Sequence, residues 1–152
     1  MKKVLLIVVA IVILIQLVPV NRENPAVTAP LDGPPALVTV LKESCYDCHS
    51  NETNWPWYAY VAPVSWLVAH DVNEGREHLN FSDWSNLDRN RQVRKADEIR
   101  EHVDEGEMPL EIYLVNHDEA RLTDDDLATI RAWVDSVKVG MPMFDATDED
   151  ED

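Results

Sequence analysis

Apolar residues recur at helical spacing in four stretches of the chain, with polar residues between them. The stretches predict helices over residues 35–45, about 64–79, about 91–104 and 123–138. No stretch of useful length alternates between apolar and polar residues as a strand does, and no segment repeats. The pattern predicts an all-α fold, a bundle of about four helices.

Local signals mark the ends of these helices. Pro35 suits the first turn of the first helix, and Thr123, which three aspartates follow, is the predicted N-cap of the last one. Gly106 suits the end of the third helix. Gly75 weakens the second helix without forbidding it.

The chain opens with two lysines and a long apolar run, the pattern of an export signal. The uninterrupted run covers 12 residues, 4–15, and the whole stretch 4–20 covers 17, just long enough to span a bilayer. A cleavage site at residues 27–29 should be blocked by Pro30. We therefore expect residues 1–20 to act as a signal anchor in preference to a cleaved signal peptide. The lysines stay cytoplasmic, which places the rest of the chain in the bacterial periplasm at the inner membrane.

Composition divides the remainder into three parts. Residues 21–35 hold four prolines and are predicted to form an extended tether. Residues 36–140 make up the folded domain, and residues 141–152 form an acidic tail that we expect to be disordered. The formal net charge of −16 repels nucleic acid and anionic membrane. It suits a basic partner protein, or simply keeps the chain soluble.

The candidate chemistry lies in the pentapeptide C-Y-D-C-H at residues 45–49, which contains both cysteines of the chain. A disulfide or thiol-exchange pair would use Cys45 and Cys48 but not His49. A structural zinc site needs four ligands, and no second ligand pair follows at a suitable spacing. C-x-x-C-H is the signature of c-type haem attachment, with two thioethers and His49 on the iron. We favour one covalent haem c per chain and keep the disulfide as an alternative.

The second axial position of the iron is filled in electron-transfer sites and open in sites that bind or transform a small ligand. Met108 is the preferred ligand because Gly106 lets the backbone turn before it and Pro109 stiffens the loop after it. The alternative is a methionine that only fills the core. His70, on the second helix, is the rival ligand. Weaker candidates are Met141, Met143, His78, His102 and His117.

Aromatic residues cluster between the pentapeptide and the third helix. They are Trp55, Trp57, Tyr58, Tyr60, Trp66, Phe81 and Trp84. A large flat apolar cofactor would explain the cluster, and ordinary packing is the alternative. On the second helix, the residues placed near the apolar side are Trp66, Leu67, His70 and Val72.

Several blocks of the chain, in order, resemble the bacterial haem-binding domain family of small membrane-anchored c-type cytochromes. The blocks are C-Y-D-C-H-S-N-E-T-N-W-P-W-Y-A-Y, E-G-R-E-H-L-N-F-S-D-W, G-E-M-P-L-E-I-Y-L-V-N-H and L-T-D-D-D-L-A-T-I-R-A-W, within about residues 36–138. The resemblance implies a cytochrome c-like all-α fold, covalent haem at Cys45 and Cys48, His49 as proximal ligand and Met108 as distal ligand. It implies no particular substrate or redox partner.

Three functions compete on this basis. The first is a membrane-tethered periplasmic electron carrier, which is not an enzyme and which exchanges electrons with a partner protein. The second is a haem enzyme or a sensor of peroxide or gas with an open or bis-His iron, for which His70 and Arg76 are the nominated distal pair. The third is a thiol protein without haem, which would leave His49 and the Met108 loop unused.

Overall fold

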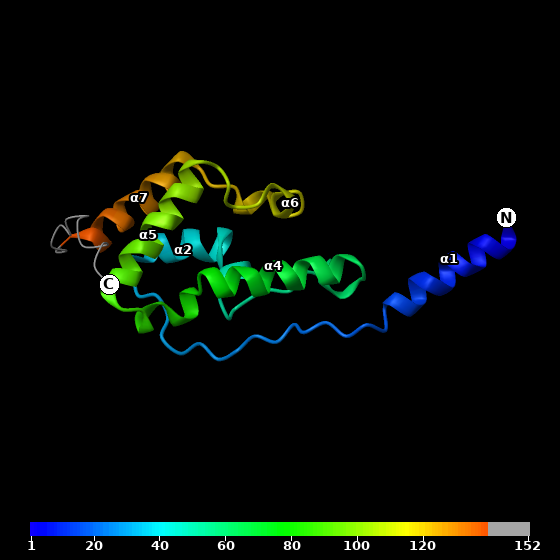
Figure 1. Cartoon of the computed structure of the whole chain (residues 1–152). Helices are drawn as coiled ribbons and strands as arrows, with labels where there is room; N and C mark the ends of the chain where they lie inside the picture. The colour runs from blue at the N-terminus through cyan, green and yellow to red at the C-terminus, as the bar shows by residue number, and fades with distance from the viewer. Residues whose placement is uncertain (140–152) are drawn as a thin grey trace, which may run out of the picture.

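The regular elements of the chain are all helical in the part that the structure, a computed structural model, describes, residues 1–139. The predicted all-α class is therefore confirmed. The four predicted helices are α2 (Pro35–Ser44), α4 (Val64–His78), α5 (Arg89–Asp104) and α7 (Asp124–Lys138) (Figure 1). The predicted acidic tail, with Met141 and Met143, lies outside the described residues.

Short helical turns connect the long helices. They are α3 (Tyr46–His49), α6 (Glu111–Leu114) and the 3₁₀ turns η1 (Trp57–Tyr60), η2 (Phe81–Asn86) and η3 (Asp118–Ala120). Each is too short to show a helical period in the sequence, so periodicity did not predict them. Two of them, α3 and α6, flank the candidate site.

Side-chain caps set the starts of the last two long helices. The Thr123 hydroxyl accepts a hydrogen bond from the Asp126 N–H (3.2 Å), and the Asp126 carboxylate accepts one from the Thr123 N–H (2.9 Å). This capping box confirms the predicted N-cap of α7. In α5, Asp88 caps the helix by accepting from the Arg91 N–H (3.0 Å), so α5 begins two residues before its predicted start.

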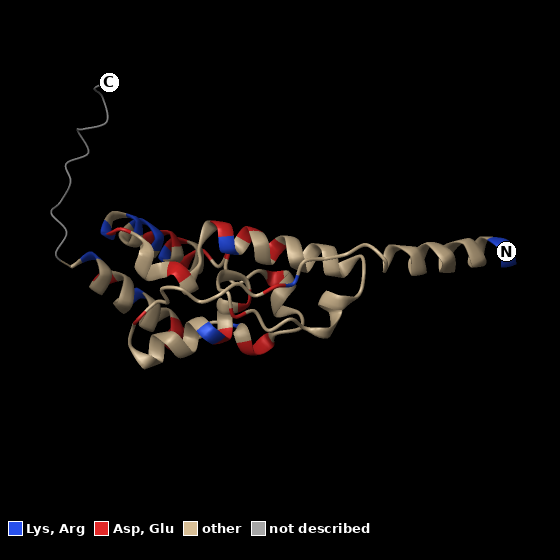
Figure 2. Cartoon of the chain, turned by 90° about the horizontal axis from the view of Figure 1, so that it is seen from below, with Lys and Arg blue, Asp and Glu red and all other residues tan. Residues whose placement is uncertain are grey.

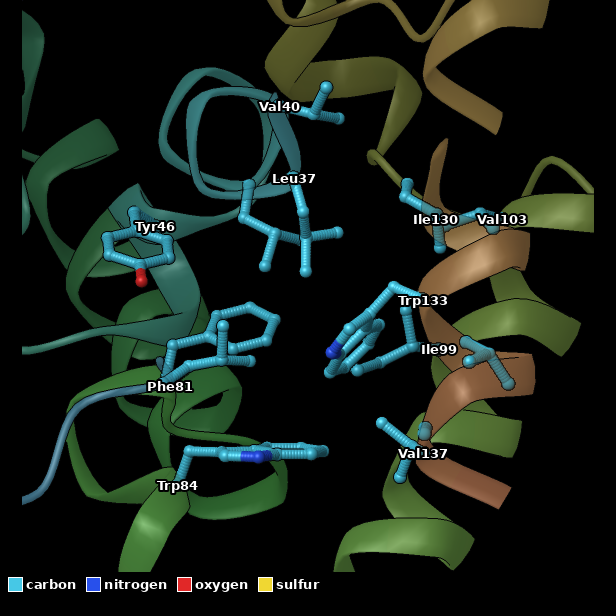
Figure 3. Close-up of a cluster of buried hydrophobic side chains, with 14 residues drawn as sticks. Leu37, Val40, Tyr46, Phe81, Trp84, Ile99, Val103, Ile130, Trp133 and Val137 are labelled. Carbon is cyan, nitrogen blue, oxygen red and sulfur yellow. The ribbon is translucent and has the colours of Figure 1, made fainter. Parts of the chain in front are cut away.

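The main core lies where α2 and η2 face α5 and α7 (Figure 3). Leu37 of α2 and Ile130 of α7 are completely buried there. The Trp84 ring of η2 packs 5.3 Å from the Trp133 ring of α7, measured between ring centroids, and Phe81 lies beside Trp84. These rings join the α5–α7 pair to the part of the chain that carries the pentapeptide.

The N-terminal apolar run forms α1 (Lys2–Ile15), which extends away from the other helices (Figure 1). The helix ends well before Val20, because Pro19 disfavours helical backbone at Val18. Among residues 1–139, no helix is both long enough and apolar enough to cross a membrane. The prediction that residues 1–20 form a spanning anchor is therefore not supported.

The proline-rich segment between α1 and α2 is extended and packs along the domain. The N–H groups of Ala29 and Leu31 donate hydrogen bonds to the carbonyls of Ser82 (3.0 Å) and Phe81 (2.8 Å). The Leu31 side chain is buried in the core. The segment thus contributes to the fold as well as leading to α1, a packing for which the sequence offered no signal.

Gly106 ends α5 and reverses the chain, as the sequence predicted. Its φ of 72° is in the left-handed region. The turn lets the N–H groups of Glu107 (2.9 Å) and Met108 (3.2 Å) donate to the His102 carbonyl at the end of the helix. This cap places Met108 directly beside the last turn of α5.

We predict that Gly106→Ala lowers the free energy of unfolding by about 1 kcal/mol, because an L side chain disfavours the left-handed conformation. No atom lies within 4 Å of the position that a Cβ would take, so backbone strain is the whole effect. Gly106→Asn should lose less, since asparagine tolerates this conformation. Chemical denaturation gives the free energy of unfolding of the wild type and of both variants. Equal values would show that position 106 does not need the left-handed conformation.

Candidate functional site

The pentapeptide forms one helical turn directly after α2. The Cys45 carbonyl accepts hydrogen bonds from the N–H groups of Cys48 (3.2 Å) and His49 (2.9 Å), which closes α3. Residues three and four positions apart lie on the same side of a helical turn. Cys45, Cys48 and His49 accordingly line the same cavity.

Two backbone carbonyls orient the His49 ring. Its Nδ1 lies 2.9 Å from the Gly75 oxygen and 3.2 Å from the Leu79 oxygen, both at the C-terminal end of α4. Carbonyls only accept hydrogen bonds, so Nδ1 carries the proton and donates. Burial lowers the pKa of His49 and favours the neutral ring. The ring is therefore held in the tautomer whose Nε2 lone pair is free to bind a metal.

Gly75 lets α4 approach the pentapeptide closely. A Cβ at this position would lie 2.7 Å from the Cys48 carbonyl oxygen and 3.1 Å from the Cys48 Cβ. A glycine inside a helix is unfavourable on its own, so its presence here has a packing reason. The missing side chain brings the Gly75 carbonyl within reach of His49.

The cavity that these residues line has a volume of about 470 Å³ and lies between α3, α4, α5 and the loop that carries Met108. Pockets for small molecules and cofactors range over roughly 300–1,000 Å³. Apolar side chains supply much of its wall: Leu79, Phe81, Ile99, Val103, Leu110 and Leu122. Charged residues of α4 and α5 also line it: Asp71, Glu74, Lys95 and Glu98.

Met108, the predicted second ligand, lines this cavity together with the pentapeptide. Its side chain is partly buried and also packs against the main core. Pro109 follows it in the cavity wall. The structure thus brings together all four predicted site residues, from segments far apart in the sequence.

The donors in the cavity fit a haem. A c-type haem uses two thiols for its vinyl groups and an imidazole for the iron, and a thioether commonly takes the second axial position. The four predicted residues supply this set inside an enclosure with a large apolar wall. In residues 1–139, no group of three or more His, Cys, Asp or Glu side chains is arranged to hold a bare metal ion. This arrangement favours haem over the zinc alternative.

Both thiols are free and protonated at neutral pH. Burial, with the neighbouring thiol, raises the pKa of Cys45 to about 12. Burial, with Asp47 and Asp71, raises the pKa of Cys48 to about 11. Thiol-exchange proteins depend on a lowered cysteine pKa, because the thiolate is the nucleophile. The environment of these cysteines is therefore the opposite of the one that a thiol exchanger needs.

The structure separates His70 and Arg76 from the cavity. His70 is exposed, and neither residue is in the cavity wall. The Arg76 guanidinium donates to the Ser50 carbonyl (2.8 Å) and the Thr53 hydroxyl (2.8 Å), and so ties α4 to the loop after the pentapeptide. The prediction of His70 as rival ligand, and of these two residues as a distal pair, is wrong because α4 turns other residues toward the cavity.

The remaining histidines occupy the margins of the site. His78 and His102 line the cavity with exposed side chains, paired with Glu74 (3.7 Å) and Glu107 (2.7 Å) respectively. His117 lies outside the cavity, against tyrosine side chains.

The aromatic cluster does not enclose the cavity as a group. Phe81 is the one member of the seven in the cavity wall. Trp84 belongs to the main core, whereas Trp57, Tyr60 and Trp66 are exposed. The interpretation of the cluster as a cofactor enclosure is wrong for these residues, because composition does not tell which side of a turn a ring occupies.

A polar link that the sequence did not reveal joins the pentapeptide to the loop after Met108. The Tyr113 hydroxyl donates to the Asp47 carboxylate (2.8 Å), and burial and this bond both raise the pKa of Tyr113. The Tyr113 ring stacks on His117 with 4.2 Å between centroids. His117 Nε2 in turn lies 2.8 Å from the Tyr58 hydroxyl. The link spans 66 positions in sequence, so local patterns give no sign of it.

An all-α domain whose cavity gathers two thiols, an imidazole and a thioether has the site of a haem-binding protein. Residues 10–136 match the family model described as haem-binding domain, and the chain belongs to this family. No curated protein and no solved structure matches the chain. The resemblance seen in the sequence is confirmed, and haem binding is the function that the family establishes.

We predict that Gly75→Ala destabilises the protein by about 1–3 kcal/mol, as overpacking does, since its Cβ would collide with the Cys48 backbone. Helix propensity alone predicts the reverse, a gain of about 1 kcal/mol. Asn73→Ala, at an exposed position of the same helix, is the control and should gain up to about 0.7 kcal/mol from helix propensity alone. Chemical denaturation decides, and a stabilised Gly75→Ala protein would show that α3 and α4 do not approach as described.

We predict that Tyr113→Phe lowers the free energy of unfolding by about 1.5–3 kcal/mol, because it removes a hydrogen bond to a carboxylate. Tyr60→Phe is the matched control, since the Tyr60 side chain is exposed. Thermal and chemical unfolding of the holoprotein compare the two variants. Equal losses would mean that the link between Tyr113 and Asp47 does not stabilise the fold.

Proposed function

We propose that the chain holds one haem covalently through Cys45 and Cys48, with His49 and Met108 as axial ligands, and that it carries electrons. The observation that supports this most is the convergence of the four side chains on one cavity. Met108 is 59 positions (108 − 49) beyond His49 in the sequence, and a separate part of the fold brings it there.

The two thiols suit covalent attachment. Each S–H would add across a vinyl C=C bond, with sulfur bonding one carbon and hydrogen the other, so no oxidant is consumed. Cys45 and Cys48 are free, and burial keeps them protonated, as the high pKa values indicate. The turn α3 presents both on the same side of the chain as His49.

The axial residues would be held with little freedom. Two carbonyls fix the His49 ring, and the α5 cap and the Tyr113–Asp47 bond fix the two ends of the loop that carries Met108. A bound haem supplies one-electron exchange between ferrous and ferric iron. Protein residues held in this way would keep the rearrangement between these states small, which is what an electron carrier needs.

The surface charge supports a basic redox partner. The chain has a net charge of −16. Four carboxylates line the cavity, those of Asp47, Asp71, Glu74 and Glu98, and Glu74 and Glu98 are exposed. One lysine, Lys95, also lines it and lies 2.6 Å from the Glu98 carboxylate, so acidic groups still predominate. An acidic rim steers a positively charged protein toward the cavity and speeds its association at low salt.

The N-terminal segment supports export. Lys2 and Lys3 are the first residues of an otherwise apolar helix, and we propose that this pattern directs the domain into the bacterial periplasm, where c-type haem is attached. Fractionation of cells that express the full chain would test this location.

The decisive test is the absorption spectrum of the full chain, co-expressed with haem-attachment machinery, together with Met108→Ala and the control His70→Ala. We expect a c-type spectrum that survives denaturation, with the weak long-wavelength band of methionine-ligated ferric haem. Met108→Ala should lose this band, bind carbon monoxide rapidly when reduced and have a lower reduction potential. His70→Ala should match the wild type, since His70 lies outside the cavity.

Other outcomes would identify the competing functions. A chromophore lost on denaturation would remove covalent attachment, and the absence of any haem would leave the thiol protein. Rapid carbon monoxide binding by the wild type would show an open iron and favour an enzyme or sensor.

A further inference from the structure

A group of exposed apolar side chains lies on η1 and the first half of α4. We call it the aromatic patch, and its members are Trp57, Tyr60, Val61, Val64, Trp66 and Leu67. Trp57 is 78% exposed and Tyr60 59% exposed. A second, smaller set lies on α6, at Leu110, Ile112 and Val115. Exposed apolar side chains gathered on neighbouring elements mark a candidate interaction site.

The aromatic patch lies in a part of the chain without formal charge. Between Glu52 and Asp71 there is no Asp, Glu, Lys or Arg, in a chain whose net charge is −16. Figure 2 shows the end of the domain nearest α1 in tan, while acidic and basic segments cover the other parts. At this end of the domain, the segregation avoids the desolvation of charged groups at an apolar surface and weakens the repulsion from anionic lipids.

The end of α1 is attached directly to the aromatic patch. The Gln16 side chain donates to the Ala62 carbonyl (3.1 Å) and accepts from the Ala62 N–H (2.9 Å). Arg22 donates to the Ala59 carbonyl (3.1 Å) and lies over the Tyr60 ring, 4.5 Å from its centroid. The aromatic patch is therefore continuous with the apolar helix, with a cation beside it.

The helix α1 exposes apolar side chains all round. None of its residues is buried against the rest of the described chain, residues 1–139. A helix that is apolar on every side is normally covered by protein or by lipid. Whatever covers α1 must also contact the tryptophan and tyrosine rings and Arg22 beside it.

We propose that the aromatic patch is a membrane-docking surface, which seats in the head-group region of a lipid bilayer while the α1 side chains contact the acyl chains. Tryptophan and tyrosine favour this boundary because each has an apolar ring and a polar group. The guanidinium of Arg22 suits the anionic lipid phosphates. The proposal is independent of the haem chemistry, because no member of the patch lines the cavity.

The test uses the full-length holoprotein with phosphatidylcholine vesicles. The patch variant is Trp57→Ser with Trp66→Ser, and its matched rescue is Trp57→Phe with Trp66→Phe. The control for a general loss of exposed apolar surface is Val139→Ser, at the end of α7. Lipid titration by flotation should give a patch variant that binds about tenfold more weakly or worse, and rescue and control variants that bind like wild type.

A second measurement locates the tryptophans. Vesicles with brominated acyl chains should quench part of the wild-type tryptophan emission, and the patch variant should lack that part. Unchanged binding and quenching in the patch variant would overturn the proposal, because α1 alone would then hold the chain. Self-association of the wild type without vesicles, abolished in the patch variant, would also overturn it and assign the surface to a second copy. The haem spectrum of each variant, recorded on the same samples, shows independently of lipid binding whether the variant has folded and bound haem.

Discussion

The close approach of α4 to the pentapeptide is the constraint on which the site depends. It requires a residue without a side chain at position 75, where any Cβ would meet the Cys48 carbonyl at 2.7 Å. The same contact brings the carbonyls of Gly75 and Leu79 to His49 Nδ1. The packing of α4 on α3, the tautomer of His49 and the orientation of its ring therefore all depend on the glycine at position 75. A wider separation of α3 from α4 would leave the cysteines in place but would release the His49 ring from the two carbonyls that orient it.

The cavity wall that carries Met108 depends on a turn and a hydrogen bond in place of a close contact between helices. There the chain leaves α5 through the left-handed turn at Gly106, and Met108 follows at once. The Tyr113–Asp47 hydrogen bond returns from this wall to the pentapeptide itself. The two walls are thus joined by a polar bond next to the cavity as well as by the core of α2, α5 and α7. The site does not rely on the cofactor alone to hold its sides together.

Sequence patterns predicted the long helices, and they singled out four residues that the structure places in one cavity, because each has a local signature. The stripe of α7, the cap at Thr123 and the turn at Gly106 need no knowledge of the rest of the fold. The wrong predictions concern which side of a helix is buried. On α4 the large apolar residues were placed inside, yet its buried face consists of Ser65, Ala69, Val72 and Gly75. At Gly75, side-chain volume is decisive, because a Cβ there would collide with the Cys48 carbonyl.

Helix α4 connects the aromatic patch to the cavity. Its first half carries Val64, Trp66 and Leu67 of the aromatic patch, and its second half carries Asp71, Glu74 and Gly75 in the cavity wall. From Leu67 to Gly75 the helix rises about 12 Å (8 residues of 1.5 Å). If the aromatic patch sits on a bilayer, the cavity is then held a short distance above it. The proposed basic partner, if it is bound to the same membrane, would then reach the acidic residues of the cavity by a search in two dimensions.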